Sequence, residues 1–183
     1  MNKKYELTDE TIVYYGHTLH RIKLLVAIGA MEAGTLGGYI ESEDNLSQEG
    51  ECMVCGSAKV YGSAKVYGSA EVYDNAEVYG SAEVYGSAKV YGSAKVYGSA
   101  EIRANARIAK KEDYITFKNF WSSGRYFTWT RSNNKWKVGC FYGTGNELIA
   151  KAYKDSKRSG REYERVVRYV ESILADEAKD KTE

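Results

Sequence analysis

A six-residue repeat occupies the middle of the chain and constrains its fold more than any other feature. From Gly56 the sequence reads GSAKVY GSAKVY GSAEVY DNAEVY GSAEVY GSAKVY GSAKVY GSAEIR ANARIA. Self-similarity at a fixed period indicates a repeat architecture. An amphipathic helix needs apolar residues at a spacing of about 3.6, whereas this unit places Ala and Val two positions apart and then breaks at Gly-Ser. The pattern predicts a short strand followed by a corner.

Strands this short cannot bury their apolar side alone, so successive strands must coil around a shared interior. Three hexads then form one coil of 18 residues. We expect a mainly β protein with a left-handed parallel β-helix over residues 37–110, a β-hairpin cap over residues 1–36, and a small α+β domain over residues 111–183. Proline, which would remove a ladder hydrogen bond, is absent from the chain.

The charged position of each hexad gives an independent check on the length of the coil. Residues 18 apart would lie side by side at about 4.8 Å, where like charges are unfavourable. The three faces carry Lys59, Glu77 and Lys95; Lys65, Glu83 and Glu101; and Glu71, Lys89 and Arg107. Four of the six neighbouring pairs are opposite in sign, which favours the three-sided coil.

Tyrosines follow the Val position in seven hexads, and the same spacing stacks them into columns. Exposed aromatic stripes are unusual on monomers, so these residues are candidates for a self-association surface. Stacking between the coils of one chain is the alternative interpretation. The columns are Tyr61, Tyr79 and Tyr97; Tyr67 and Tyr85; and Tyr73 and Tyr91.

Both ends of the repeat carry other patterns. Ile40 and Leu46 keep the six-residue spacing and Val54 follows after eight, which predicts a first coil near Ile40 with a two-residue insertion. Residues 11–15 and 18–27 are apolar runs around a Gly-His turn, which predicts the hairpin.

Downstream, strand-like segments at 114–120, 125–131 and 135–142 predict a three-stranded antiparallel meander. Two capping boxes then predict two helices, one opening at Thr144 with Glu147 and one at Ser159 with Glu162.

Composition narrows the class of protein. With 26 basic and 25 acidic residues, the whole chain gives no reason to expect nucleic acid or membrane binding, although residues 118–168 carry 12 basic and 4 acidic side chains. Three irregularly spaced cysteines argue against a disulfide framework, and no apolar run suits a signal peptide or a membrane span. We expect a cytoplasmic protein with no membrane partner.

Aromatic and cationic side chains alternate through the predicted meander, a composition that suits stacking on bases and neutralising phosphate. A sheet with one core face and one solvated face has the same pattern, with Trp136, Val138, Cys140 and Tyr142 in the core, and this is the competing interpretation. The candidate ligand- or partner-binding residues are Lys118, Arg125, Tyr126, Trp129, Arg131, Lys135 and Lys137.

Catalytic residues, metal ligands and cofactors are not predicted. Acyl transfer on a hexapeptide β-helix needs a histidine base, and the repeats contain none; His17 and His20 lie in the predicted hairpin, where a surface or capping role is expected. Cys52 and Cys55 have CxxC spacing, but the repeat places Cys52 inward and Cys55 at a corner, so the two side chains diverge.

Several motifs outside the hexads resemble a family of phage and prophage hexapeptide-repeat proteins. They are the leader at 5–11, the segments 36–42 and 46–50, and Gly139-Cys140-Phe141 with Gly143-Thr144. The resemblance spans nearly the whole chain. It implies a viral accessory protein of the infected bacterial cytoplasm, and it supplies no catalytic residues.

These observations lead to three functional hypotheses. The first is a non-catalytic phage protein that acts in counter-defence, binding a bacterial protein or a nucleotide-like ligand as an oligomer, with a trimer favoured. The second is a structural spacer of the virion. The third, and least favoured, is an acyltransferase in which His17 or His20 reaches the coil of a neighbouring subunit.

Overall fold

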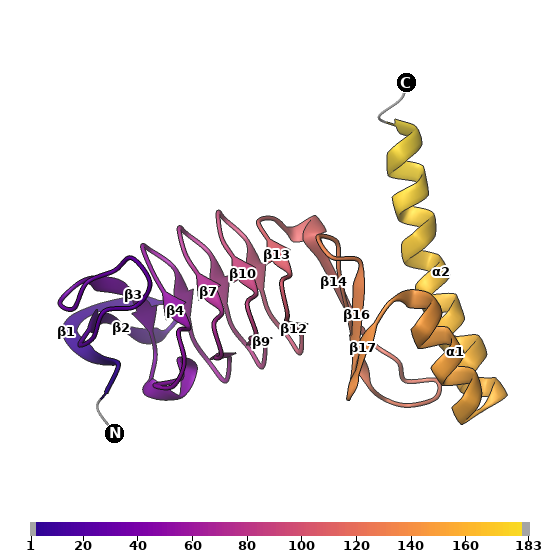
Figure 1. Cartoon of the computed structure of the whole chain (residues 1–183), viewed down its shortest axis with the longest axis horizontal. Helices are drawn as coiled ribbons and strands as arrows, with labels where there is room; N and C mark the ends of the chain where they lie inside the picture. Colours follow the sequence, from indigo (N-terminus) through magenta and orange to yellow (C-terminus); the bar gives the residue numbers. More distant parts are fainter. Residues whose placement is uncertain (1–2, 181–183) are drawn as a thin grey trace. The chain divides into compact units, whose positions relative to one another are not determined.

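Each hexad forms a two-residue strand and a tight corner, so the predicted parallel β-helix is confirmed (Figure 1). The computed structural model describes residues 3–180. The corners need a left-handed backbone, with φ of 67° at Gly62 and 60° at Asp74, which glycine and aspartate tolerate. The coil strands are β4 (Met53–Val54), β5 (Lys59–Val60), β6 (Lys65–Val66), β7 (Glu71–Val72), β8 (Glu77–Val78), β9 (Glu83–Val84), β10 (Lys89–Val90), β11 (Lys95–Val96), β12 (Glu101–Ile102) and β13 (Arg107–Ile108).

Parallel pairing joins strands that are three hexads apart, as the charge pattern predicts. Lys59 pairs with Glu77, and Glu77 pairs with Lys95 on the next coil. The second and third faces follow the same rule, with the strand orders β12-β9-β6 and β13-β10-β7-β4. The residues within each of the three charge columns inferred from the sequence therefore lie side by side on successive coils.

The first coil is longer than the others by two residues. Ile40 pairs with Val60 and Leu46 bridges to Val66, whereas Val54 pairs with Val72 at the regular spacing. The predicted two-residue insertion between Leu46 and Val54 is confirmed.

Inside the coil, the Ala and the Val or Ile of every hexad are buried in one continuous apolar core. Backbone bonds between coils complete the structure, as in Glu77 N–H to the Ala94 carbonyl at 2.9 Å. The coils approach so closely that a Cβ added at Gly86 would lie 2.8 Å from the Ala104 nitrogen. At Gly86 the missing side chain is thus a packing requirement as well as a conformational one.

An antiparallel hairpin closes the N-terminal end of the coil, in agreement with the sequence. It consists of β1 (Tyr5–Tyr14) and β2 (His17–Leu24), and β2 pairs with β3 (Leu36–Ile40) at the edge of the first sheet. Tyr5 is fully buried, and its hydroxyl donates to the Leu46 carbonyl at 2.6 Å. The hairpin therefore covers a strand edge that would otherwise be open to pairing.

Downstream of the coil the chain forms a second sheet and two helices. The sheet has the order β14-β15-β16-β17, which is four strands rather than the predicted three. The difference arises at Gly139, whose φ of 54° opens a turn that divides the last predicted strand in two and leaves Cys140 exposed rather than in the core. The strands are β14 (Tyr114–Lys118), β15 (Tyr126–Thr130), β16 (Lys135–Val138) and β17 (Phe141–Gly143).

Contacts divide the chain into two compact units. Unit 1 contains the hairpin and the coil up to Thr116, together with Thr130–Asn133; unit 2 contains Phe117–Trp129 and the residues from Asn134 onward. The core of unit 2 is aromatic, with Phe127, Trp136 and Tyr163 in edge-to-face contact at ring distances of 4.7 and 6.3 Å.

Helix α1 (Gly145–Asp155) begins at the predicted capping box, where the Glu147 N–H donates to the Thr144 hydroxyl. Helix α2 (Lys157–Asp180) starts earlier than predicted, so the Ser159 capping box is wrong. Ser156 holds the position before the first turn instead, and its hydroxyl accepts from the Ser159 N–H at 3.0 Å. The polar Ser-Lys-Arg-Ser segment offers two serines as caps, and the spacing to Glu162 favoured the wrong one.

Candidate functional site

The predicted basic–aromatic residues do not form one site. Trp129 is only 4% exposed, and its Nε1–H donates to Asn134 Oδ1 at 2.9 Å, so its ring belongs to the core of unit 2 and is not a contact surface. Arg131 belongs to unit 1, where its Nε–H donates to the Glu112 carbonyl at 3.0 Å. Both residues therefore have structural roles and are not part of a common binding site with the other candidates.

Lys135 and Lys137 lie on β16 and alternate with Trp136 and Val138, which are buried. Lys137 also donates to the Gly139 carbonyl. This pair follows the competing interpretation of the sequence, in which a core face alternates with a partly solvated charged face.

Three candidates, Lys118, Arg125 and Tyr126, surround an exposed loop. Sequence alternation predicts a strand through Phe120, but β14 ends at Lys118, and Phe120 with its neighbour Trp121 therefore lies in the turn that follows. Phe120 is 72% exposed and Trp121 is 59% exposed, while their ring centroids lie 4.6 Å apart. We call residues 119–126 the aromatic tip.

Hydrogen bonds to Asn119 fix the backbone of the aromatic tip. The side-chain Oδ1 of Asn119 accepts from the backbone N–H groups of Trp121 at 3.0 Å and Ser122 at 3.2 Å. The backbone N–H of Asn119 donates to the Arg125 carbonyl at 2.8 Å. Arg158 of α2 adds a bond from its guanidinium to the Trp121 carbonyl at 2.5 Å. The two exposed rings are thus presented on a loop whose backbone is tied at both ends.

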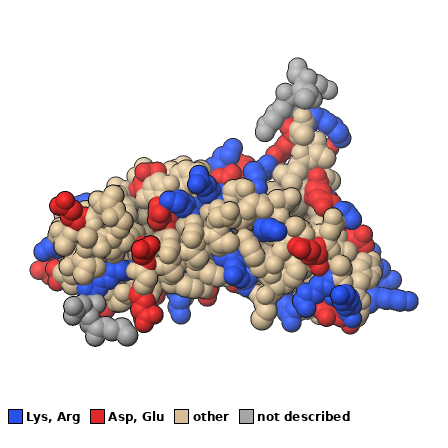
Figure 2. Space-filling model, in the orientation of Figure 1, with Lys and Arg blue, Asp and Glu red and all other residues tan. Residues whose placement is uncertain are grey.

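Cationic residues flank the loop that carries this pair of rings. Lys118 places its ammonium 5.7 Å from the centre of the half-exposed Tyr126 ring, and Arg125 and Arg158 are exposed. Figure 2 shows further Lys and Arg side chains gathered over the turn between α1 and α2. The tip therefore combines apolar rings with positive charge.

All three tyrosine columns stack as the spacing predicts. Neighbouring rings lie 4.8–5.2 Å apart and within 12° of parallel. The second column also stabilises the like-charge pair Glu83–Glu101, because each carboxylate accepts a hydrogen bond from a tyrosine. The Tyr67 hydroxyl donates to Glu83 at 2.8 Å, and the Tyr85 hydroxyl donates to Glu101 at 3.1 Å. The columns thus have a clear role within one chain, and their role in self-association stays a prediction.

Both histidines make polar contacts within unit 1. His17 Nδ1 lies 2.9 Å from Glu41 Oε1, and that carboxylate also accepts from the Gly62 N–H at 2.7 Å. His20 Nδ1 lies 3.2 Å from the Thr8 carbonyl. Both contacts tie the hairpin together or to the coil, which suits the capping role expected from the sequence.

The two cysteines of the CxxC segment have separate environments. Cys52 is fully buried, with its Sγ 3.1 Å from the Lys4 ammonium. Cys55 lies 3.8 Å from the Met31 sulfur, and burial raises the pKa of its thiol to about 11, which keeps it protonated at neutral pH. Within residues 3–180, no group of three or more His, Cys, Asp and Glu side chains is placed to hold a metal ion.

Comparison with models of known protein families gives no match, and comparison with curated proteins likewise gives none. Over the part of the chain that the structure describes, no helix combines the length and apolarity that a membrane crossing requires. The case for function therefore rests on the residues themselves.

Proposed function

We propose that this protein is a non-catalytic binding protein that docks a partner protein on its aromatic tip. The observation that carries the proposal is the exposed ring pair of Phe120 and Trp121 on a loop fixed by Asn119. Adjacent exposed aromatic side chains that form a patch mark interaction sites, and Trp, Tyr and Arg are the residues that most often dominate protein–protein binding energy.

A protein partner fits this surface better than a nucleic acid strand does. The Phe120 and Trp121 rings lie 31° from parallel and contact each other, so they form a wedge and not a pair of open stacking platforms. Such a wedge fills a pocket on a folded surface. Lys118, Arg125 and Arg158 around it favour a partner whose pocket is rimmed by acidic side chains.

The resemblance to phage hexapeptide-repeat proteins supplies the biological setting of this proposal. In that setting the partner is a bacterial defence protein, and the binding protein acts in counter-defence inside the infected cell. We further propose that the chain works as an oligomer, with a trimer favoured, because three copies would present three tips at once and raise the effective affinity.

Infection assays test this function directly. The full chain is expressed in bacterial strains that each carry a different defence system, and plaques of a phage that the system blocks are counted. We expect plaque numbers to rise on at least one strain, and the Phe120→Ala/Trp121→Ala double variant to lose this effect. Tyr169→Ala, which removes an exposed aromatic ring from α2 outside the aromatic tip, serves as the matched control and should retain it.

Two results would contradict the proposal. If the wild-type chain raises plaque numbers on none of the strains, the counter-defence role fails. If it does raise them and the double variant is equally effective, the role stands but the aromatic tip is not the surface that performs it.

A structural spacer of the virion is the second candidate, because the stacked coils and tyrosine ladders make a repetitive scaffold. Its test is the protein content of purified phage particles. Stoichiometric presence of this chain in particles would favour the spacer, whereas its presence in the cell lysate and its absence from particles would favour the binding protein.

A further inference from the structure

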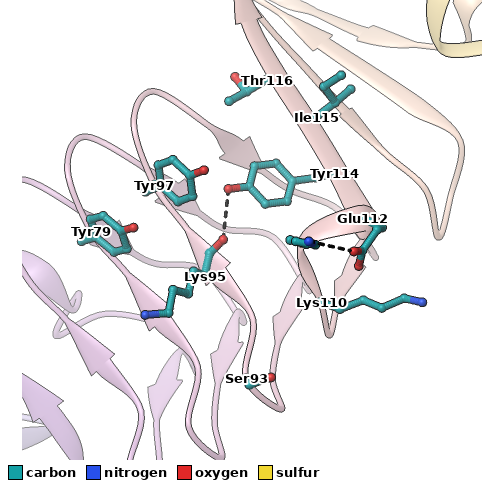
Figure 3. A pocket seen from close by; sticks show the side chains of 10 residues that line it. Tyr79, Ser93, Lys95, Tyr97, Lys110, Glu112, Tyr114, Ile115 and Thr116 are labelled. Carbon is teal, nitrogen blue, oxygen red and sulfur yellow. Dashed lines mark hydrogen bonds and ion pairs between the residues drawn. The ribbon is translucent and has the colours of Figure 1, made fainter. Parts of the chain in front are cut away.

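A groove lies beside the last coils of unit 1, outside the aromatic tip. It encloses about 760 Å³ and is lined by the coil residues Tyr79, Lys95 and Tyr97 and by Lys111 and Tyr114 from the segment that follows (Figure 3). Cavities of this size suit small ligands. The lining combines three aromatic rings with basic side chains.

The groove sits at the open end of the first tyrosine column. At the opposite end of this column, Tyr61 is 6% exposed because Tyr14 and His17 of the hairpin cover its ring at 6.0 and 5.0 Å. Tyr97, the last ring of the column, is 49% exposed. One end of the stack is therefore covered by the hairpin, and at the other end the half-exposed Tyr97 ring faces the groove with Tyr114 beside it (Figure 3).

The other columns end differently. In the second column, Arg103 lies one coil beyond Tyr85 and places its guanidinium 5.2 Å from the centre of that ring. The third column ends at Tyr91, which is half buried and does not line the groove. Among the three columns, the first is thus the one whose terminal ring is the most exposed.

Polar groups of the groove are suited to an anion. The Lys95 ammonium pairs with Glu77 at 2.9 Å, and the Lys111 ammonium lies 3.7 Å from Glu112 on a side chain that is 87% exposed and can turn toward a bound anion. Lys110 extends away from the rings in Figure 3, while the Ser93 hydroxyl lies at the lower edge. Tyr114 donates its hydroxyl to the Lys95 carbonyl at 3.0 Å, which fixes the groove wall.

We propose that this groove binds a small molecule that combines a planar ring with an anionic group, as a mononucleotide does. The ring continues the column by stacking on Tyr97, and the anionic group lies near Lys111 and the Ser93 hydroxyl. Stacking on one aromatic face and a charge-assisted contact are the two interactions that hold nucleotides on aromatic platforms. This site is independent of the partner surface on the aromatic tip.

Calorimetric titration of the full chain with adenosine 5′-monophosphate tests the inference. We expect measurable binding, weakened about tenfold in Tyr97→Ala through loss of the stacking face and restored in Tyr97→Phe. Lys111→Ala should weaken it several-fold, adenosine without the phosphate should bind more weakly, and inorganic phosphate alone should give no heat. Tyr91→Ala is the matched control, since it removes a terminal ring that does not line the groove, and it should leave the affinity unchanged.

The inference is overturned if adenosine, guanosine, cytidine and uridine monophosphates all fail to bind at millimolar concentration. It is also overturned if Tyr91→Ala weakens binding as much as Tyr97→Ala does. Tryptophan emission separates the two surfaces, because Trp121, Trp129 and Trp136 all belong to unit 2. Quenching of that emission by the nucleotide, with loss of binding in Trp121→Ala, would place the site on the aromatic tip and contradict the groove.

Discussion

Aromatic residues serve opposite purposes in the two units. In the coil, each tyrosine is repeated one coil later and stacks on its copy, as Tyr79 does with Tyr61 and Tyr97 at 5.2 Å. In unit 2 the aromatic residues do not repeat, and two of its tryptophans differ in exposure: Trp129 is buried, whereas Trp121 is exposed. Repetition therefore builds a scaffold of stacked rings, whereas the unrepeated aromatic residues divide between the core of unit 2 and the exposed pair Phe120 and Trp121.

The largest effect is expected from a charge placed inside the coil. Val78→Asp buries a carboxylate in an interior lined by Ala and Val, where no partner is available among the core residues. Such a change costs about 5 kcal/mol, enough to unfold a small repeat body. Far-ultraviolet circular dichroism should show loss of the β signal. Arg107→Asp, on the exposed face beside Lys89, is the control and should keep it.

Two tryptophans in unit 2 separate folding from binding. Trp136→Ala removes a buried ring that contacts Phe127, and we expect a loss of about 3–5 kcal/mol in the free energy of unfolding. Trp121→Ala removes an exposed ring and should change that free energy by less than about 0.5 kcal/mol. Urea unfolding followed by the emission of the remaining tryptophans measures both. Equal losses would mean that the exposed ring is structural.

The tyrosine ladder gives an intermediate effect that depends on position. Tyr79→Ala removes two stacking contacts and Tyr97→Ala removes one, so we expect losses of about 2 and about 1 kcal/mol. Chemical denaturation of each variant, monitored by circular dichroism, checks the ratio. A loss at Tyr97 equal to that at Tyr79 would show that the terminal ring does more than extend the stack.

The smallest effect concerns pH. The side-chain hydrogen bond from His17 and the Gly62 N–H lower the pKa of the Glu41 carboxyl below its usual value of 4.5. The carboxylate therefore stabilises the fold above that pH, and the contribution is lost as the pH falls through the lower, folded-state pKa. Because Glu41 is partly exposed, we expect about 0.5 kcal/mol or less.

Thermal melting between neutral and acidic pH measures this contribution. Glu41→Gln should lower the melting temperature at neutral pH and flatten its decline on acidification, whereas Glu32→Gln, at an exposed position, should leave the profile unchanged. An unchanged profile in Glu41→Gln would show that the contact between hairpin and coil is not electrostatic.

The coil could be predicted from the sequence almost residue by residue. Period and alternation together determine which residues face inward, which pair across coils, and where Leu46 and Val54 interrupt the spacing, because each position is constrained by copies of itself. The four-stranded sheet could not be predicted in the same way, since a single Gly139 decides whether one strand or two follow Lys135.

The site was harder to predict for a related reason. Alternating aromatic and basic residues are compatible with a core or with a surface, so the pattern selected the buried Trp129 as a candidate and missed the exposed Phe120 and Trp121. The informative signal was the position of Phe120 and Trp121 between Asn119 and Ser122-Ser123-Gly124, since turn-forming residues on both sides place the pair outside the strand. The groove depends on where a tyrosine column ends, which requires the neighbouring coil segments in three dimensions.

Site-specific photo-cross-linking tests the central claim most directly. A photoreactive phenylalanine derivative replaces Trp121 of the aromatic tip in one variant and Tyr73 of the coil in another, and both are irradiated in phage-infected cells. We predict one discrete, protease-sensitive adduct from position 121, insensitive to nuclease and formed with a bacterial protein of acidic surface, and no such adduct from position 73. An adduct with a bacterial protein from position 73 alone, or a nuclease-sensitive adduct from position 121, would contradict the proposed docking on the aromatic tip.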